Sequence, residues 1–260
     1  MPKQTTWNLV WLIISKMRYL SYISVLLVCW ACQKAPERSC WKDTGPIEIT
    51  QLPLDSFSFL HVHPHMEVVL VHDSLNFVEW QAGQNLKSFL SATIENDTLQ
   101  LYNRNRCGFL RYRQGDVKVM VHYQTLKELH LDNSETVSTY NKWTQDDVLI
   151  FLKEGVGKVI VTLNAQKVTV RNNYGWQNLR LSGTVGALFV DLDGSAALEA
   201  PALQVQDSIS FRSASALSSW LRPDQILLKA QLYGAGNLYY SKTPATLLKT
   251  EYGTGKVLPK

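Results

Sequence analysis

Residues 155–194, GVGKVIVTLNAQKVTVRNNYGWQNLRLSGTVGALFVDLDG, contain the pattern that decides the fold. Small-residue turns stand at Gly155-Val156-Gly157, Asn173-Tyr174-Gly175 and Gly194-Ser195. Short runs rich in β-branched and apolar residues separate them, at 159–163, 167–170 and 187–190. The interval from turn to turn is about 20 residues, which is the length of one coil in a β-solenoid. The stretch therefore predicts stacked β-coils.

The same spacing continues on both sides of this stretch. Further turns lie near Asn133-Ser134, Ser213-Ala214-Ser215, Gly234-Ala235-Gly236 and Gly253-Thr254-Gly255. The first half of the chain lacks the strict period but contains short β-like runs between turn formers. Asn96-Asp97 between two such runs indicates a hairpin. The sequence therefore predicts an all-β protein, a right-handed parallel β-helix or β-roll-like solenoid.

In such a fold, alternate residues point inward and stack on the equivalent residues of the next coil. We expect Leu129 and Leu131 to stack under Leu149 and Phe151 in this way. A β-sandwich is the alternative architecture, because its strands are also short and its turns are also closely and evenly spaced.

Composition and net charge argue for a protein with a buried core and against a nucleic-acid-binding protein. The chain has 260 residues, 45% hydrophobic and 18% charged, which is enough to bury a sizeable core. Of the formal net charge of +4, three positive charges lie in the leader at Lys3, Lys16 and Arg18, which leaves about +1 for the rest. No basic face is implied, so nucleic acid is not an expected partner.

Residues 1–31 are expected to be a secretory signal peptide, and Met17 is a candidate true start. Ala31-Cys32 resembles the cleavage site of a bacterial lipoprotein signal, in which Cys32 carries the lipid. Residues 32–46 would then form a lipidated tether, and residues 47–258 the solenoid domain. An ordinary secreted protein, with Cys32 incidental, is the alternative.

Two cysteines remain once the signal and the lipidated cysteine are set aside. Cys40 and Cys107 form an even pair in an oxidising compartment, and we predict a disulfide between them. Two separate buried thiols are the alternative.

Particular residues resemble a known family. Residues 57–60 (FSFL), 68–70 (VVL), 85–86 (NL) and 96–99 (NDTL) are similar to the opening of the putative auto-transporter adhesin, head GIN domain family. Residues 232–240 (LYGAGNLYY) and 253–257 (GTGKV) are similar to its closing repeats. The resemblance implies a β-helix-like protein of the bacterial cell envelope, lipid-anchored or secreted, with no catalytic residue to carry over. The turn at 213–215 departs from the pattern because it lacks glycine.

Two groups of residues are candidates for chemistry. His61, His63 and His65 alternate, as zinc or copper ligands on one strand face would, but Pro64 interrupts them and no carboxylate or cysteine is adjacent in the chain. Asp191 and Asp193 alternate like an acid–base pair, although a solvated strand end is the favoured explanation. We therefore expect no metal, no cofactor and no catalytic residue.

The aromatic residues near the turns carry the binding hypothesis. Tyr174 and Trp176 flank one turn, and Tyr233 and Tyr239 flank another. Exposed rings would form a platform for a glycan or a protein partner; rings that cap the core are the alternative.

Together these patterns predict a non-enzymatic lipoprotein of the cell envelope, held on the outer membrane, facing the periplasm or the cell surface. Its expected partners are the membrane through the lipid anchor and a glycan or envelope protein. A polysaccharide-active β-helix enzyme and a purely structural envelope protein remain alternatives.

Overall fold

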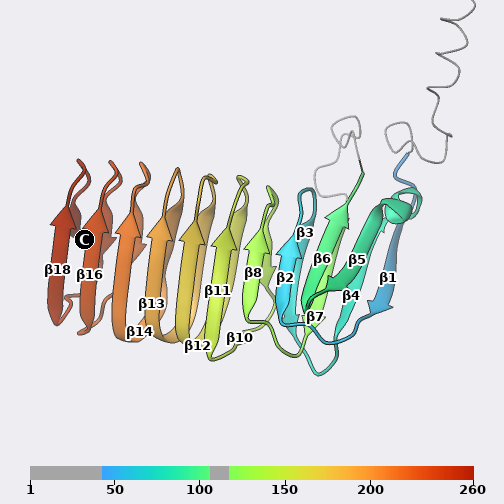
Figure 1. Ribbon diagram of the computed structural model, residues 1–260, viewed down its shortest axis with the longest axis horizontal. Helices are drawn as coiled ribbons and strands as arrows, with labels where there is room; N and C mark the ends of the chain where they lie inside the picture. Colours follow the sequence, from blue (N-terminus) through green and yellow to red (C-terminus); the bar gives the residue numbers. More distant parts are fainter. Residues whose placement is uncertain (1–42, 106–116) are drawn as a thin grey trace, which may run out of the picture. The chain divides into compact units, whose positions relative to one another are not determined.

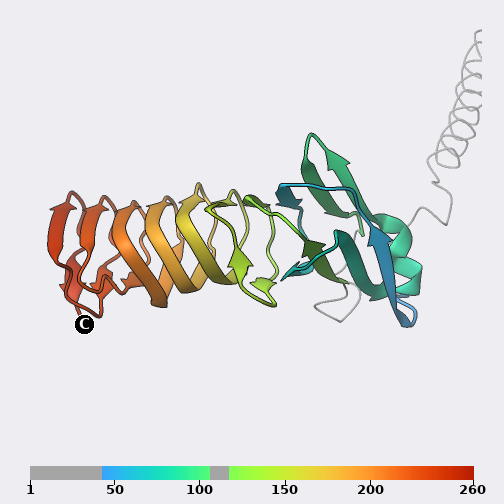
Figure 2. The same ribbon diagram turned by 90° about the horizontal axis from the view of Figure 1, so that it is seen from below.

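Parallel strands one coil apart build the C-terminal half of the protein (Figure 1). The computed structural model describes residues 43–105 and 117–260. Asp147 lies beside Lys167 in the next coil, and Lys167 lies beside Ala187 in the one after. The register thus repeats at the interval that the turns predicted, which confirms the all-β solenoid. Figure 2 shows the coils as successive rungs.

Each coil has two faces. The first face contains β8 (Glu128–Leu131), β11 (Asp147–Leu152), the second halves of β12 (Lys158–Asn172), β13 (Asn178–Leu192) and β14 (Ala197–Ser213), then β16 (Leu227–Leu232) and β18 (Thr246–Glu251). The second face contains β9 (Val137–Thr139), β10 (Trp143–Thr144), the first halves of β12, β13 and β14, then β15 (Ser219–Leu221), β17 (Leu238–Tyr240) and β19 (Val257–Pro259). In β12, β13 and β14 one continuous strand runs from the second face to the first, and a turn leads on to the next coil.

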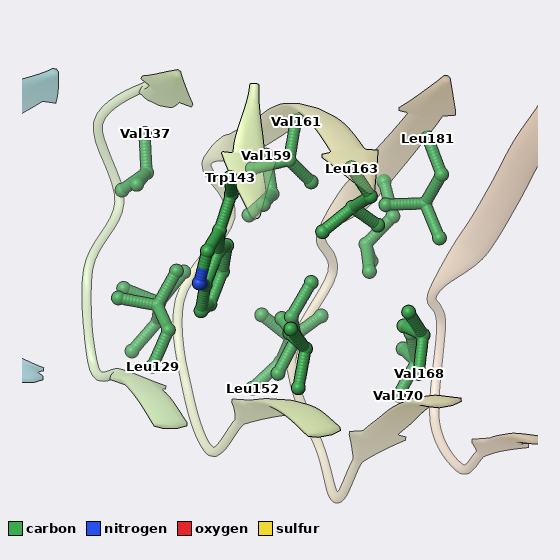
Figure 3. Close-up of a cluster of buried hydrophobic side chains, with 14 of the residues drawn as sticks. Leu129, Val137, Trp143, Leu152, Val159, Val161, Leu163, Val168, Val170 and Leu181 are labelled. Atoms are coloured by element: carbon green, nitrogen blue, oxygen red, sulfur yellow. The ribbon is translucent and has the colours of Figure 1, made fainter. Parts of the chain in front are cut away.

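The core lies between the two faces, where inward side chains stack from coil to coil (Figure 3). On β11 the buried side chains are Val148, Ile150 and Leu152. Leu149 and Phe151 point outward, so the expectation that they stack on Leu129 and Leu131 is wrong. A shift of one residue exchanges the two faces of a strand, and in the run 148–152 every residue is apolar, so the alternation is hidden.

Glycines at the turns serve two different purposes. Gly155 and Gly194 adopt positive φ, 120° and 79°, which residues with a Cβ rarely adopt. Gly236 has no positive φ, but a Cβ there would lie 2.0 Å from the carbonyl oxygen of Leu217 in the preceding coil. At that position the missing side chain allows neighbouring coils to approach.

The N-terminal half combines parallel and antiparallel pairing. Its elements are β1 (Ile47–Pro53), β2 (Phe59–Val62), β3 (Glu67–His72), β4 (Phe77–Gly83), the 3-10 helix η3 (Gln84–Phe89), β5 (Leu90–Glu95), β6 (Thr98–Asn103) and β7 (Val117–Tyr123). Strands β5 and β6 form the hairpin expected at Asn96-Asp97, whose φ angles of 50° and 61° are left-handed. Antiparallel pairing of β4 with β1 and with β7 was not anticipated.

The order of coils in space differs from their order in the sequence. Strand β2 lies between β6 and β8 (Figure 1). Strand β3 lies between β7 and β9, and the pairing is parallel on both sides of both strands. The coil made of β2 and β3 is therefore enclosed by coils that come later in the chain.

Candidate binding surface

Parallel pairing lines up outward side chains of successive coils into rows along each face. Tyr233 and Tyr252, one coil apart, follow β16 and β18 at the turns. Their rings stack with centroids 4.6 Å apart and planes 15° apart. The guanidinium of Arg212 lies over the Tyr233 ring, 5.0 Å from its centroid. This cluster presents two aromatic rings and a cation, and Tyr233 is 42% exposed.

Arg212 connects the aromatic cluster to the two aspartates of β13 and its turn. Its Nη1 donates to Asp191 Oδ1 and lies 3.4 Å from Asp193 Oδ1. The hydrogen bond with Asp191 raises the pKa of Arg212. The two carboxylates considered as an acid–base pair thus share one guanidinium, which gives them a structural partner.

A second aromatic pair lies on the other face. Trp220 of β15 and Tyr239 of β17 are register neighbours, and their rings stack with centroids 5.6 Å apart. The Nζ of Lys260 lies over both rings, 5.7 Å from the Trp220 centroid and 5.9 Å from that of Tyr239. Asn237 Nδ2 donates to the Tyr239 hydroxyl over 3.1 Å. Two flat rings and a cation are therefore arranged together.

The turn at 173–177 points its rings into solvent. Tyr174 is 81% exposed and Trp176 is 67% exposed, so neither caps the core. The buried Gln177 side chain holds the turn instead. Its Nε2 donates to the Glu154 carbonyl over 2.7 Å, and its Oε1 accepts from Asn172 Nδ2 over 3.2 Å. A well-anchored turn thus displays two exposed aromatic rings.

The four aromatic residues nominated from the sequence do not form one site. Tyr174, Trp176 and Tyr233 belong to turns that follow strands of the first face, whereas Tyr239 lies on the second face. The sequence analysis did not identify Tyr252, which stacks on Tyr233, or Trp220, which stacks on Tyr239. Both could have been found, because each lies 19 positions from its partner, close to the period of the coils.

A histidine cluster lies on the first face, on the enclosed strand β2 and just beyond it. The ring centroids of His61 and His63 are 4.1 Å apart. His61 Nε2 is 3.1 Å from Oδ2 of Asp132, the residue that follows β8. Burial lowers the pKa of His61, an effect that the Asp132 hydrogen bond opposes and nearby His63 reinforces. His65 lies apart, with Nδ1 3.8 Å from Glu135 Oε1. No sequence pattern pointed to Asp132, since 71 positions separate it from His61.

The predicted lipidation site Cys32 and the predicted disulfide of Cys40 with Cys107 lie outside the described residues, as do the signal peptide 1–31 and Met17. These assignments stay predictions. In residues 43–105 and 117–260, no helix has the length and hydropathy required to cross a bilayer.

Fold and surface together define a class: a β-solenoid whose stacked coils display rows of aromatic and charged side chains. The chain belongs to the family described as putative auto-transporter adhesin, head GIN domain, whose model matches residues 56–244. The resemblance inferred from the sequence is thereby confirmed.

Solved structures from two bacterial genera share the fold. A putative adhesin of Bacteroides fragilis superimposes with a TM-score of 0.70 at 17% identity, covering 83% of this chain and 97% of its own. A putative lipid binding protein of Parabacteroides distasonis gives 0.60 at 18% identity, with the same coverage of both chains. A putative adhesin of Parabacteroides distasonis gives 0.58 at 15% identity, covering 83% of this chain and 98% of its own. No curated protein matches the sequence.

Proposed function

We propose that this protein is a non-enzymatic, lipid-anchored module of the cell envelope that adheres to a glycan through the aromatic pairs of its C-terminal coils. The observation that carries the proposal is the stacked pair of Trp220 and Tyr239 beneath the Lys260 ammonium.

Trp220 and Tyr239 suit a sugar for a physical reason. Aromatic rings combine a broad apolar face with a polar edge, so they contact the C–H faces of a pyranose while hydroxyls and charges bind its oxygens. Lys260 and the Asn237 amide supply such polar groups next to the rings. The stacked rings of Tyr233 and Tyr252 offer a second contact of the same kind on the turns.

The location is proposed on separate grounds. Membership of an adhesin-like family agrees with a cell-envelope protein. Lipidation at Cys32 would hold the domain on the outer membrane. The adhesive role requires the solenoid to face the medium.

Glycan binding is tested on an array with the full chain, the double variant Trp220→Ala/Tyr239→Ala and the control Tyr140→Ala. Tyr140 is well exposed, whereas Trp220 and Tyr239 are half-buried, and Tyr140 has no stacked partner among the described residues. We expect a glycan signal that the double variant loses and the control keeps. Absence of any signal, or equal loss in the control, would overturn the glycan proposal and leave an envelope protein as the partner to seek by crosslinking.

The anchor and the orientation are tested in cells. Cys32→Ser should release the protein from the membrane fraction and abolish incorporation of labelled palmitate. Antibody labelling of intact cells should disappear after external protease. A signal seen only in permeabilised cells contradicts adhesion.

Catalysis is tested with the glycan that the array identifies. We expect no change in its chain length after prolonged incubation. Turnover that Asp191→Asn abolishes would replace the adhesion proposal with a polysaccharide-active enzyme.

A further inference from the structure

Strands β2 and β8 bring together polar side chains from distant parts of the chain. Their parallel register places His61 beside His130. The pairing continues one step further, because the Asp132 N–H donates to the Val62 carbonyl over 3.0 Å, which sets Asp132 beside His63. Alternate residues of a strand share one face, so all four side chains lie on the outer face of the solenoid.

Three of these side chains have the geometry of metal ligands. One ring nitrogen each of His61 and His63 and a carboxylate oxygen of Asp132 all lie within 4.8 Å of one another. Two ligands of a tetrahedral zinc ion, each about 2.0–2.1 Å from the metal, are about 3.3 Å apart. His61 Nε2 and Asp132 Oδ2 are already 3.1 Å apart, so only His63 needs a small side-chain rotation.

We propose that His61, His63 and Asp132 bind a divalent transition metal ion, and that zinc is the ion that this ligand set fits best. Two imidazoles and one carboxylate are typical zinc ligands, and water completes the coordination on the solvent side.

The surroundings of Asp132 support a cation at this position. Its Oδ1 is buried without a hydrogen-bond partner, so Oδ2, which faces His61, is the oxygen in position to bind an ion. Lys153 Nζ is 3.7 Å from the same Oδ2, so this oxygen already has a cation beside it. The carboxyl side chain is 17% exposed, which is shielded enough to strengthen the interaction and open enough for an ion to enter.

Neighbouring side chains fix the His63 ring, as outer partners of metal ligands do. Gln100 Oε1 lies 3.1 Å from His63 Nε2. The Tyr102 ring stacks on His63 with centroids 3.9 Å apart and planes 14° apart. These contacts limit the ring to a narrow range of orientations before an ion binds.

Zinc binding at this point would couple two parts of the fold. His61 and His63 belong to the enclosed coil, and Asp132 belongs to the first coil of the regular solenoid. An ion that binds only the folded chain stabilises it by mass action. The site would therefore fasten the N-terminal strands to the solenoid.

The binding test uses the full chain in detergent, purified through a tag that contains no histidine and freed of metal with EDTA. Calorimetric titration with zinc chloride should give one ion per chain. Cobalt chloride should produce the visible absorption of a tetrahedral cobalt site, and zinc should displace it. Absence of saturable zinc binding overturns the proposal.

Substitutions test which residues bind the zinc ion. His61→Gln, His63→Gln and Asp132→Asn should each weaken zinc binding at least about tenfold. The matched control is His65→Asn, which removes the third alternating histidine and keeps a residue that tolerates its φ of 75°. Equal weakening in the control, or unchanged binding in the three ligand variants, contradicts the assignment.

Folding of the variants is checked by circular dichroism and thermal unfolding in EDTA. If a variant does not fold, NMR spectroscopy of the unmodified protein tests the assignment instead. Zinc should shift the ring resonances of His61 and His63, and should leave those of His65 and His72 in place. Shifts confined to the latter pair overturn the proposal.

Discussion

Trp143 and Tyr123 are the two largest side chains that the described core buries completely, and they differ in one respect. The indole N–H of Trp143 donates to the Leu126 carbonyl over 2.7 Å. The Tyr123 hydroxyl is buried without a partner, and this burial raises its pKa. Removal of a satisfied buried group costs stability, whereas removal of an unsatisfied one does not.

Replacement of each residue by phenylalanine should therefore have opposite results. Trp143→Phe should cost at least about 2 kcal/mol, because it leaves a void and an unpaired carbonyl. The unfolding free energy of Tyr123→Phe should lie within about 1 kcal/mol of that of the original protein or above it. Urea unfolding followed by circular dichroism measures both, and a larger loss for Tyr123→Phe would contradict this reasoning.

Glu251 closes the turn between β18 and β19 through its carboxylate. It accepts the Val257 N–H over 2.9 Å and lies 3.0 Å from Lys256 Nζ, with Lys249 Nζ 3.5 Å away. The backbone hydrogen bond, followed by the Lys256 contact, lowers the pKa of Glu251 from 4.5 to about 2.

The sign of the pH effect follows from this lowered pKa. Between pH 4.5 and about 2 the unfolded chain binds a proton at Glu251 that the folded chain does not. The stabilisation is complete above pH 4.5 and is lost as the pH falls through about 2. Glu251→Gln should therefore be less stable than the original protein at neutral pH. The difference in unfolding free energy should shrink on acidification, as urea titrations at several pH values would show; a constant difference refutes it.

At the scale of the element, the register of β11 can be tested by neighbouring substitutions. Ile150 is fully buried and Leu149 faces outward, half-buried. Ile150→Ala should cost about 2–5 kcal/mol. Leu149→Ala should cost less than about 1 kcal/mol. Comparable losses at the two positions would show that the strand is not oriented as described.

The regular coils could be predicted because their turns recur at a nearly constant interval along the sequence. Gly155 and Gly194 mark corners of coils, and Asn96-Asp97 marks a hairpin. The inward face of β11 could not be predicted, because an apolar run such as 148–152 has no alternation to read. Packing against the neighbouring coils decides which face of β11 points inward, and the residues of this one strand do not show that packing.

The candidate surfaces were predictable only where the period applies. Tyr233 and Tyr239 were identified, and their stacking partners lie one period away. The pairing of His61 with Asp132 was not predictable, since β2 and β8 become neighbours only through the rearranged order of coils. No periodic rule connects these two strands.

At the scale of the whole molecule, the coils should be removable as units. Leu227 and Thr246 are equivalent positions, as are Leu238 and Val257, so residues 227–245 make one complete coil. Deletion of 227–245 should give a folded protein with a smaller denaturant m-value, because less surface is buried. The final coil keeps its place at the end of the described chain.

The control is a deletion of half that length, residues 227–235, which shifts inward side chains out of register. This variant should unfold at much lower urea or fail to fold. Similar stability of the two deletions would show that the coils are not equivalent units.

The enclosed position of β2 and β3 sets a constraint on the time order of folding. As the chain emerges from the ribosome, β2 appears early, yet its two flanking strands appear later. Leu60 must wait for Leu129, far along the chain, whereas each regular coil pairs with the coil that directly follows it. Short loops close faster, so we expect the C-terminal coils to form first and the N-terminal strands to join in a slower step. The protein would then assemble against the direction of its own synthesis.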